Sequence, residues 1–349
     1  MLENNKEIKL SIIVPVYKVE QYIERCVRSL MEQTMKDNIE FIFINDCTPD
    51  NSMQILKQII NAYPNRKEQI RIIENEHNIG VSATRKLGVK IAQGEYIGWC
   101  DSDDWVEPTM YEELYQGTQN GKIDNVICNF IIEKETHKEE VIYNPCKTPK
   151  DCIINNWKGY YFPGSLWQQI NRKQYIEKAI NTIINVNYGE DIYTLFLVYY
   201  YSKSSAYTTK QLYHYNANNV SSLLHNTNYS YDSWLLQKQN IDKISKILYS
   251  NNGYKKYHVA INALKHSTKT HFKSAFKNIY QFYHTYSECY KDYNIYTFTP
   301  KAKRIKTYLV HNIYVLYWLF YRDYKNRDFF NYPPQYPQYY CNNTLDYTK

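Results

Sequence analysis

Three carboxylates stand together directly behind an apolar run, in Asp101-Ser102-Asp103-Asp104. The run before them, residues 96–100, has the pattern of a buried strand, and an unpaired carboxylate in such surroundings costs free energy. A cation is therefore expected here, and carboxylates on a turn suit a hard divalent ion that keeps positions open for phosphate oxygens. The alternative is an acidic surface turn in which Asp104 caps a helix that starts near Glu107-Pro108. These residues alone do not separate the two interpretations.

The elements that must position these carboxylates alternate along the chain. Apolar runs at residues 8–16, 39–44, 70–73 and 96–100 predict buried strands, and apolar residues at helical spacing predict intervening helices over 19–34, 53–63 and 83–91. This alternation predicts an α/β fold with a mostly parallel, right-handed sheet that has helices on both faces. Ligands of such sheets bind at the carboxyl ends of the strands, where Pro15-Val16-Tyr17, Asp46 and Asp101–Asp103 should converge.

The expected ligand is a nucleoside diphosphate held through a metal. No GxGxxG follows the first strand and no GxxxxGK[ST] occurs, so phosphate charge must be met by a metal on the Asp cluster and by a cation such as Arg85. Tyr17 offers an aromatic face for a base, and Asp46 an acceptor for a base N–H. Each has a plainer alternative: Tyr17 as a core residue, Asp46 as a turn or cap residue, and Arg85 as a solvated helix position.

Residues 9–115 resemble the nucleotide-binding half of family 2 glycosyltransferases of the GT-A fold, the group that builds bacterial surface polysaccharides such as capsule. The matching pieces are Ser11-Ile12-Ile13-Val14-Pro15-Val16-Tyr17, Val19-Glu20-Gln21-Tyr22-Ile23, Gln33-Thr34, Asn45-Asp46-Cys47-Thr48-Pro49-Asp50, Asn78-Ile79-Gly80-Val81-Ser82, Arg85, Gly94-Glu95-Tyr96-Ile97 and Asp101-Ser102-Asp103-Asp104. Asn45 and Cys47 depart from the usual Asp and Gly, and Lys86 from a common Asn.

The resemblance implies a role for each residue of the site. Pro15 and Tyr17 would flank the uracil of the donor, and Asp46 would read its N3–H. Asp101 would lie near the ribose, and Arg85 near the phosphates. Asp103 would bind the cofactor, a Mg²⁺ or Mn²⁺ ion that bridges the diphosphate.

The catalytic base is expected downstream of the nucleotide-binding half. Glu190 and Asp191 precede a helical stripe, so Asp191 stands at a helix start and, on the sequence alone, is best explained as an N-cap. In the family a Glu-Asp pair in this setting, after a Trp segment like residues 166–170, supplies the base as its Asp. Mapped here, Asp191 would take the acceptor's proton in one inverting displacement. Glu190 is the rival base.

Two histidines close to this region have an open role. Residues 213–216 and 219–223 resemble the strand and loop that close over the donor in this family. His214 or His225 could then reach the diphosphate or the metal, because imidazole can do either. A surface histidine is the alternative for both.

We expect residues 1–225 to form the GT-A catalytic domain, with a nucleotide-binding half at 1–115 and an acceptor-side half at 116–225. Residues 226–330 would form a helical extension rich in basic and aromatic residues, and 331–349, rich in Pro, Gln, Tyr and Asn, a disordered tail. The cysteines form no CxxC pair and the first residues contain no apolar export signal. Both features indicate a reduced, cytoplasmic protein.

The extension suggests contact with a membrane surface. Lys265, Lys269, Lys273 and Lys277 recur every fourth residue, and a basic cluster at 301–306 precedes an apolar run at 308–321 that is shorter than the ~20 residues needed to span a bilayer. Residues 265–327 could therefore dock on the anionic inner face of the cell membrane, where lipid-linked saccharide acceptors reside. A core helix with a solvated lysine face explains the pattern equally well.

Together these features predict an inverting glycosyltransferase that moves a sugar from a nucleotide-sugar donor, a UDP-sugar, to a saccharide or lipid-linked saccharide acceptor. The net charge of +7 permits nucleic-acid binding, but no such module is present and the basic residues concentrate after residue 250. A nucleotidyltransferase usually carries a Gly-rich loop after its first strand, and residues 16–20 contain no Gly. A non-catalytic nucleotide-sugar binder would differ only in the behaviour of an Asp191 mutant. The sequence does not identify the sugar, the acceptor or the linkage.

Overall fold

The computed structural model describes residues 7–142, 148–156, 164–186, 189–219 and 230–250, with positions 257, 258, 260–262, 264 and 265. The chain divides into two compact units. The first consists of residues 1–152 and 162–226, and the second of residues 153–161 and 227–349.

In chain order the elements are β1 (Leu10–Val16), α1 (Ile23–Met31), β2 (Ile39–Asn45), α2 (Ser52–Asn61), η1 (Pro64–Gln69), β3 (Ile70–Glu74), α3 (Val81–Ile91), β4 (Tyr96–Trp99), β5 (Trp105–Val106), α4 (Met110–Gly117), β6 (Asn125–Glu133), β7 (Lys138–Val141), α5 (Pro149–Asn156), η2 (Leu166–Gln168), β8 (Gln169–Arg172), α6 (Lys173–Thr182), α7 (Glu190–Tyr201), β9 (Ser205–Asn216) and α8 (Tyr231–Ser250). Every strand and helix expected before residue 100 is present, with ends within a few residues of the expected ones.

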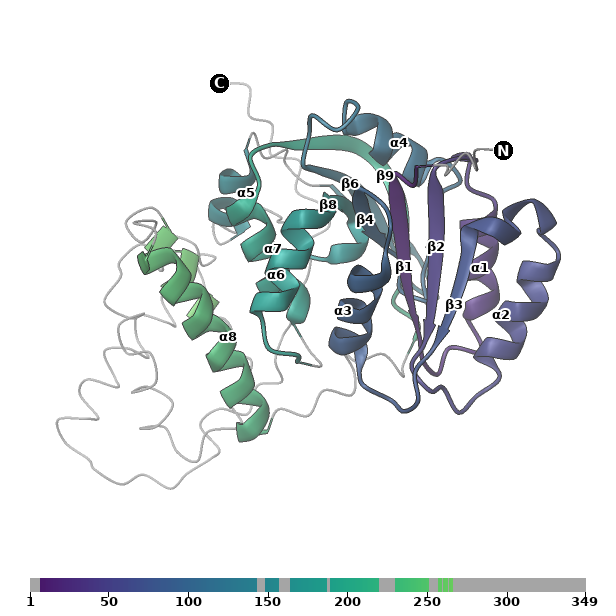
Figure 1. Ribbon diagram of the computed structural model, residues 1–349, viewed down its shortest axis with the longest axis horizontal. Helices are drawn as coiled ribbons and strands as arrows, with labels where there is room; N and C mark the ends of the chain where they lie inside the picture. Colours follow the sequence, from purple (N-terminus) through teal and green to yellow (C-terminus); the bar gives the residue numbers. More distant parts are fainter. Residues whose placement is uncertain are drawn as a thin grey trace, which may run out of the picture. The chain divides into compact units, whose positions relative to one another are not determined.

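The first unit is built on one mixed sheet with strand order β3-β2-β1-β4-β8-β6-β9-β5, and β7 pairs with β6. Strands β3, β2, β1 and β4 are mutually parallel, as expected. In Figure 1, α1 and α2 lie on one side of these strands and α3 lies on the other. The predicted α/β fold with helices on both faces is therefore confirmed.

The other half of the sheet is not mainly parallel. Strand β8 runs antiparallel to both β4 and β6, and the pairs β6–β7 and β5–β9 are also antiparallel, whereas β6 and β9 are parallel. For the pair β6–β7 the physical reason is the connection, because β6 returns directly through a short turn to β7 and a short return forces the antiparallel direction. The strict alternation of strands and helices, on which the prediction depended, ends after β4.

Burial explains why the parallel strands form and how α3 is held against them. Residues 10–14 and 39–44 are buried, because helices cover both faces. On α3, Gly88 packs so closely on the sheet that a Cβ would lie 2.5 Å from Cγ2 of Ile13. This close approach brings the start of α3, including Arg85, down to the carboxyl edge of the sheet.

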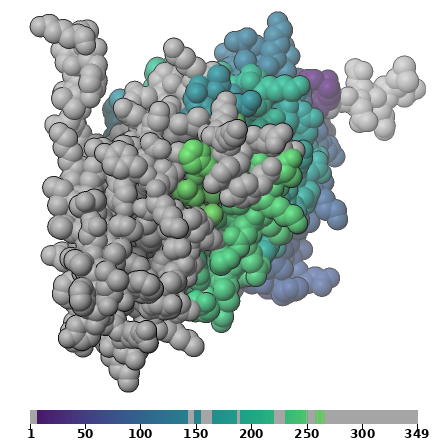
Figure 2. All heavy atoms as spheres, turned by 90° about the vertical axis from the view of Figure 1, so that its left-hand side faces the viewer, coloured from purple at the N-terminus to yellow at the C-terminus, as the bar shows by residue number. Residues whose placement is uncertain are grey.

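The described part of the second unit is mainly α8. Its apolar stripe of Trp234, Ile241, Ile244 and Leu248 is buried, and part of the helix reaches the surface on the face shown in Figure 2. Of the four lysines spaced every fourth residue, only Lys265 is described, and it is buried. The expected membrane-docking segment 301–325 and the tail 331–349 lie outside the described residues. Among the residues that are described, no helix has the length and apolar character needed to cross a bilayer.

Candidate functional site

The guanidinium of Arg85 brings together acidic residues from two distant parts of the chain. Its Nη2 donates to Oδ1 of Asp101 at 2.6 Å, and its Nη1 donates to Oδ1 of Asp191 at 2.6 Å and to Oε1 of Glu190. The Arg85 side chain is only 5% exposed, so the alternative of a solvated helix position is wrong. We call Arg85, Asp101, Glu190 and Asp191 the Arg85 centre.

The electrostatics of the Arg85 centre follow from burial. Burial opposes the charge of Arg85, but Asp191, Asp101 and Glu190 outweigh it and raise the pKa of the guanidinium further. Burial also raises the pKa of Glu190 to about 8, with Asp191 adding to the effect and Arg85 opposing it. The pKa of Asp191 is raised as well, chiefly by burial, while Arg85 acts to lower it. The centre therefore holds more carboxylates than its one guanidinium can neutralise.

Asp191 does not cap its helix. The N-cap of α7 is Gly189, with φ of 75°, and no side chain bonds to the helix end there. Instead, Oδ2 of Asp191 accepts a hydrogen bond from the backbone N–H of Leu166 at 3.2 Å, while Oδ1 faces Arg85. The N-cap alternative is therefore wrong, and the carboxylate turns toward the edge of the sheet where Asp101 lies.

Asp103 is a half-buried carboxylate that lies between Asp101 and Asp104 in the turn after β4. Burial raises its pKa to about 6, and the nearby charge of Asp101 adds to this effect. Its Oδ2 accepts from Nδ2 of Asn219 at 2.8 Å. In the part of the chain that the structure describes, no three His, Cys, Asp or Glu side chains are grouped to hold a metal ion. The arrangement fits an ion such as Mg²⁺ or Mn²⁺ that takes one or two protein carboxylates and completes its shell with substrate phosphates.

Asp104 has a different role from its neighbours. It is 1% exposed and accepts hydrogen bonds from the Tyr213 hydroxyl at 2.6 Å and the backbone N–H of Asn216 at 2.7 Å. Helix α4 begins only at Met110, with Thr109 as its N-cap, and β5 comes between. The alternative that Asp104 caps this helix is therefore wrong.

Asp46 lies at the carboxyl end of β2 and is surrounded by uncharged donors. Its Oδ1 accepts from Nδ2 of Asn75 and the N–H of Ile79, each at 2.8 Å, and Oδ2 accepts from the N–H of Gly80 at 2.9 Å. Its carbonyl accepts from Nδ2 of Asn78 at 3.2 Å. We call these five residues the Asp46 centre. The interpretation of Asp46 as a turn residue holds, and one acceptor position on Oδ2 remains for a ligand N–H.

Pro15 and Tyr17 lie beside the Asp46 centre. Pro15 pairs with Ile44 in the β1–β2 register, and the N–H of Asp46 donates to the carbonyl of Val16 at 3.0 Å. Tyr17 is 40% exposed, so the alternative that it belongs to the core is wrong. The sheet edge therefore presents an accessible aromatic ring next to a fixed carboxylate.

The loop after β1 and the loop after β2, which lie at this edge of the sheet, are hydrogen-bonded to each other. The N–H groups of Lys18, Val19 and Glu20 donate to Oγ1 of Thr48, Oγ of Ser52 and Oδ2 of Asp50. Cys47 has φ of 56°, in the left-handed region that favours glycine. The family's usual Gly at this position is thus explained by the backbone, and Cys47 adopts that conformation at some cost.

His214 is engaged away from the carboxylates of residues 101–104. Its Nδ1 lies 2.8 Å from Glu133 and its Nε2 2.7 Å from Glu107, and its ring stacks on Trp105 at 5.1 Å. The guanidinium of Arg25 also lies over the Trp105 ring, 3.1 Å from its centroid. His225 lies outside the described residues.

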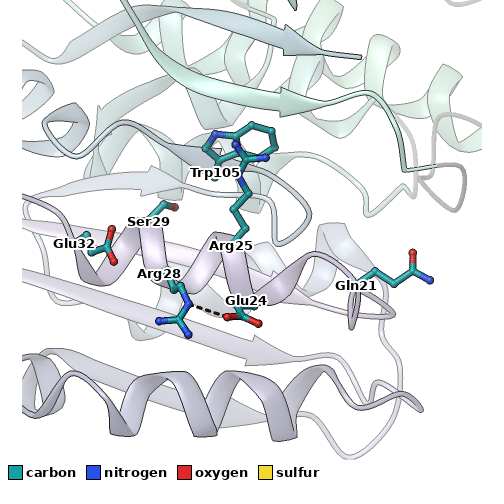
Figure 3. A pocket seen from close by; sticks show the side chains of 7 residues that line it. All are labelled: Gln21, Glu24, Arg25, Arg28, Ser29, Glu32 and Trp105. Atoms are coloured by element: carbon teal, nitrogen blue, oxygen red, sulfur yellow. Dashed lines mark hydrogen bonds and ion pairs between the residues drawn. The ribbon is translucent and has the colours of Figure 1, made fainter. Parts of the chain in front are cut away.

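Figure 3 shows an open pocket at this stack, separate from the Arg85 and Asp46 centres. Its lining comes from α1 and the residues Gln21 and Glu32 on either side of it, together with Trp105 of β5, and Arg28 is paired with Glu24 along the helix. None of the residues assigned to donor, metal or base by the sequence lines this pocket.

Comparison with known proteins agrees with this arrangement. Residues 11–167 match the family model "Glycosyl transferase family 2". The protein named as glycosyltransferase EpsH of Bacillus subtilis is 32% identical over 213 residues, covering 59% of this chain and 60% of EpsH. The poly(ribitol-phosphate) beta-glucosyltransferase of Bacillus spizizenii is 42% identical over 119 residues, which are 34% of this chain and 18% of that protein.

A solved structure extends the likeness in fold. The S. aureus TarS 1-349 complex with UDP-GlcNAc superposes with a TM-score of 0.63 at 17% identity, over 87% of this chain and 88% of that one. This likeness concerns the fold, which is that of a GT-A glycosyltransferase. The motifs at the sheet edge, the family match and this architecture agree: residues 11–167 are similar to glycosyl transferase family 2, and the fold that contains them is of the GT-A type.

Proposed function

We propose that this protein is an inverting glycosyltransferase that moves a sugar from a nucleotide-sugar donor, a UDP-sugar, to a saccharide or lipid-linked saccharide acceptor. The observation that carries the proposal is the Arg85 bridge. Asp101 and Asp191, far apart in the sequence, each lie 2.6 Å from the same guanidinium. This contact supports the proposal because it brings Asp191, the candidate base, close to Asp101, the residue assigned to the donor.

In this proposal Asp191 is the general base. The N–H of Leu166 fixes one of its oxygens, so the carboxylate keeps its orientation while it accepts the proton of the acceptor hydroxyl. Glu190 is a poorer candidate, because its pKa of about 8 leaves it mostly protonated at neutral pH. Arg85 stands between the base and Asp101, and because three carboxylates already share its charge, the charge of a bound diphosphate would be met mainly by the metal ion.

The donor is assigned from the edge of β1, β2 and β4. Tyr17, with Pro15 behind it, would cover the uracil face, and the remaining acceptor position of Asp46 would receive N3–H. Asp101 would approach the ribose. Asp103 would hold a Mg²⁺ or Mn²⁺ ion, which when bound stabilises the negative charge of the leaving diphosphate.

The relatives support this choice of reaction class. EpsH and the Bacillus spizizenii enzyme are both named for glycosyl transfer, and the TarS structure holds a UDP-sugar in a related fold. This chain spans 60% of EpsH and less of the second relative, so its acceptor is assigned only by chemical class. We place the enzyme on the cytoplasmic side of the membrane that carries lipid-linked acceptors, with residues 265–327 as the docking segment.

A donor panel tests the proposal. UDP-, GDP- and dTDP-sugars are assayed for release of the nucleotide with Mn²⁺, with Mg²⁺ and with EDTA, using the full chain. We expect release from UDP-sugars that depends on the metal. Release that is unchanged by EDTA would contradict the metal assignment, and binding of UDP-sugars without any turnover, in the presence of candidate acceptors, would favour a non-catalytic binder.

A further inference from the structure

The carboxyl end of β9 holds the turn that carries the acidic residues. The hydroxyl of Tyr213 donates to Oδ2 of Asp104 at 2.6 Å and accepts a hydrogen bond from the N–H of Asp101 at 3.1 Å. The N–H of Asp104 also donates to the carbonyl of Asp101 at 3.0 Å, closing the turn. One oxygen atom from a strand more than a hundred residues away therefore ties both ends of the 101–104 turn together.

Two asparagines extend this contact to Asp103. Nδ2 of Asn216 donates to the carbonyl of Asp103 at 3.1 Å, and Nδ2 of Asn219 donates to its carboxylate Oδ2 at 2.8 Å. Because Asp103 sits between two residues fixed by Tyr213, its backbone has little freedom. Asn219 occupies one carboxylate oxygen, which leaves Oδ1 to face a ligand.

Tyr213 is itself held on the side away from the turn. It is fully buried, and its ring stacks on Trp167 with centroids 4.2 Å apart and planes at 17°. Trp167 follows Leu166, whose N–H binds Asp191. The tyrosine thus connects the turn of Asp101 and Asp103 to the segment that orients the proposed base.

We propose that Tyr213 is a positioning residue, which sets the placement of Asp101 and Asp103 relative to Asp191 through its hydroxyl. The inference rests on the proposed function, since it presumes that Asp103 takes a divalent ion. Asp104 then acts as the buried acceptor that fixes the turn, and contacts neither the ion nor the donor.

The test is Tyr213→Phe, which removes one oxygen and keeps the ring on Trp167. Binding of Mn²⁺ in the presence of UDP is followed by the loss of the free Mn²⁺ signal in electron paramagnetic resonance. Removing a hydrogen bond to a charged partner corresponds to about 10- to 100-fold in affinity, so we expect Mn²⁺ binding to weaken by that factor. UDP binding without metal, to which Asp101 contributes at the ribose, should weaken less than Mn²⁺ binding does.

The matched control is Tyr207→Phe, at the other end of β9, whose hydroxyl donates to Oδ1 of Asn129. It also loses a tyrosine hydroxyl from the same strand, and its Mn²⁺ affinity should stay within about twofold of the wild type. If Tyr213→Phe and Tyr207→Phe lower the melting temperature alike and leave Mn²⁺ affinity alike, the hydroxyl of Tyr213 is merely structural and the inference is overturned.

A second variant keeps the inference testable if Tyr213→Phe does not fold. Asp104→Asn replaces the carboxylate that accepts from the Tyr213 hydroxyl and keeps the tyrosine itself, so it should also weaken Mn²⁺ binding selectively. Wild-type Mn²⁺ affinity in a folded Asp104→Asn protein would contradict the inference. Failure of the wild type itself to bind Mn²⁺ with UDP would instead contradict the proposed function, so the two failures are distinguishable.

Discussion

The Asp46 centre and the Arg85 centre lie at the same edge of the sheet but stabilise their carboxylates in different ways. Asp46 is 3% exposed and receives its hydrogen bonds from two backbone N–H groups and two asparagine amides. The Arg85 centre sets three carboxylates against a single guanidinium. The Asp46 carboxylate is held by neutral donors and keeps one acceptor position for a ligand N–H, whereas the Arg85 centre carries excess negative charge.

This difference indicates separate roles for the two centres, recognition of the base at the Asp46 centre and catalysis at the Arg85 centre. A carboxylate fixed by neutral donors keeps its geometry at any pH at which it is ionised, as recognition of a flat base requires. A cluster with excess negative charge gains most from a metal ion and responds to protons, as catalysis at a diphosphate requires. Changes at the Arg85 centre should therefore affect turnover and metal use, and changes at the Asp46 centre should affect stability.

The largest effect is expected for Asp191→Asn. Removal of a general base typically lowers the rate by ~10² to 10⁴-fold without a matching loss of donor affinity. The amide keeps an oxygen for the N–H of Leu166, so the fold should persist. Transfer rates and the dissociation constant for the UDP-sugar are measured together. Glu190→Gln is the matched control, and a larger loss there than in Asp191→Asn would give the role of base to Glu190.

The second-largest effect is expected for Asp103→Asn, which should act on metal binding and not on the general base. Since the side chain lies at the sheet edge, the variant should fold, yet it should lose most metal-dependent affinity for UDP. Isothermal titration with UDP at saturating Mn²⁺ measures the effect. Affinity equal to that of the wild type would show that Asp103 does not bind the ion.

Asp46→Asn should act mainly on stability. The amide nitrogen must face at least one of the N–H donors of the Asp46 centre, and a buried donor left without its acceptor costs about 1–3 kcal/mol. Urea unfolding measures the loss, with Asp151→Asn as a control because that carboxylate accepts from Thr148 in an exposed turn. A loss of stability as small as in the control would show that the hydrogen bonds to the Asp46 carboxylate do not stabilise the fold.

The same comparison explains what the sequence could and could not predict. Tyr17, Asp46, Asp101 and Asp103 follow strands of a parallel sheet, and Pro15 is the next-to-last residue of β1, so their meeting at one edge follows from topology. The roles assigned to them remain predictions. The antiparallel half of the sheet was missed because the alternation of strands and helices, on which the prediction depended, ends after β4: β5 follows β4 and β7 follows β6 without a helix between them.

The sequence also did not predict contacts between residues that are far apart in the chain. The pairing of Arg85 with Glu190 and the bond between Tyr213 and Asp104 join residues more than a hundred positions apart. No spacing rule encodes them. The only sequence signal for Tyr213 was its place in an alternating aromatic strand, which predicts burial but not a hydroxyl partner.

The last test, and the sharpest separation of the two centres, concerns pH. Burial holds the pKa of Glu190 at about 8 in the folded protein against 4.5 as its ordinary value. Between these values the folded state binds more protons than the unfolded state, so stability is highest below about pH 4.5 and falls as pH rises toward 8. Asp103, raised from 3.8 to about 6, has the same sign over its own window.

Urea unfolding at pH 5, 6, 7 and 8 checks this trend. The free energy of unfolding should decline with pH in the wild type, and Glu190→Gln should flatten the decline because the amide does not titrate. Glu24→Gln is the control: Glu24 pairs with Arg28 on the surface, so its loss should shift the curve slightly without changing the slope. If the free energy of unfolding falls with pH at the same slope in all three proteins, Glu190 does not titrate between pH 5 and 8. Glu190 would then be ionised throughout, with its charge balanced by Arg85.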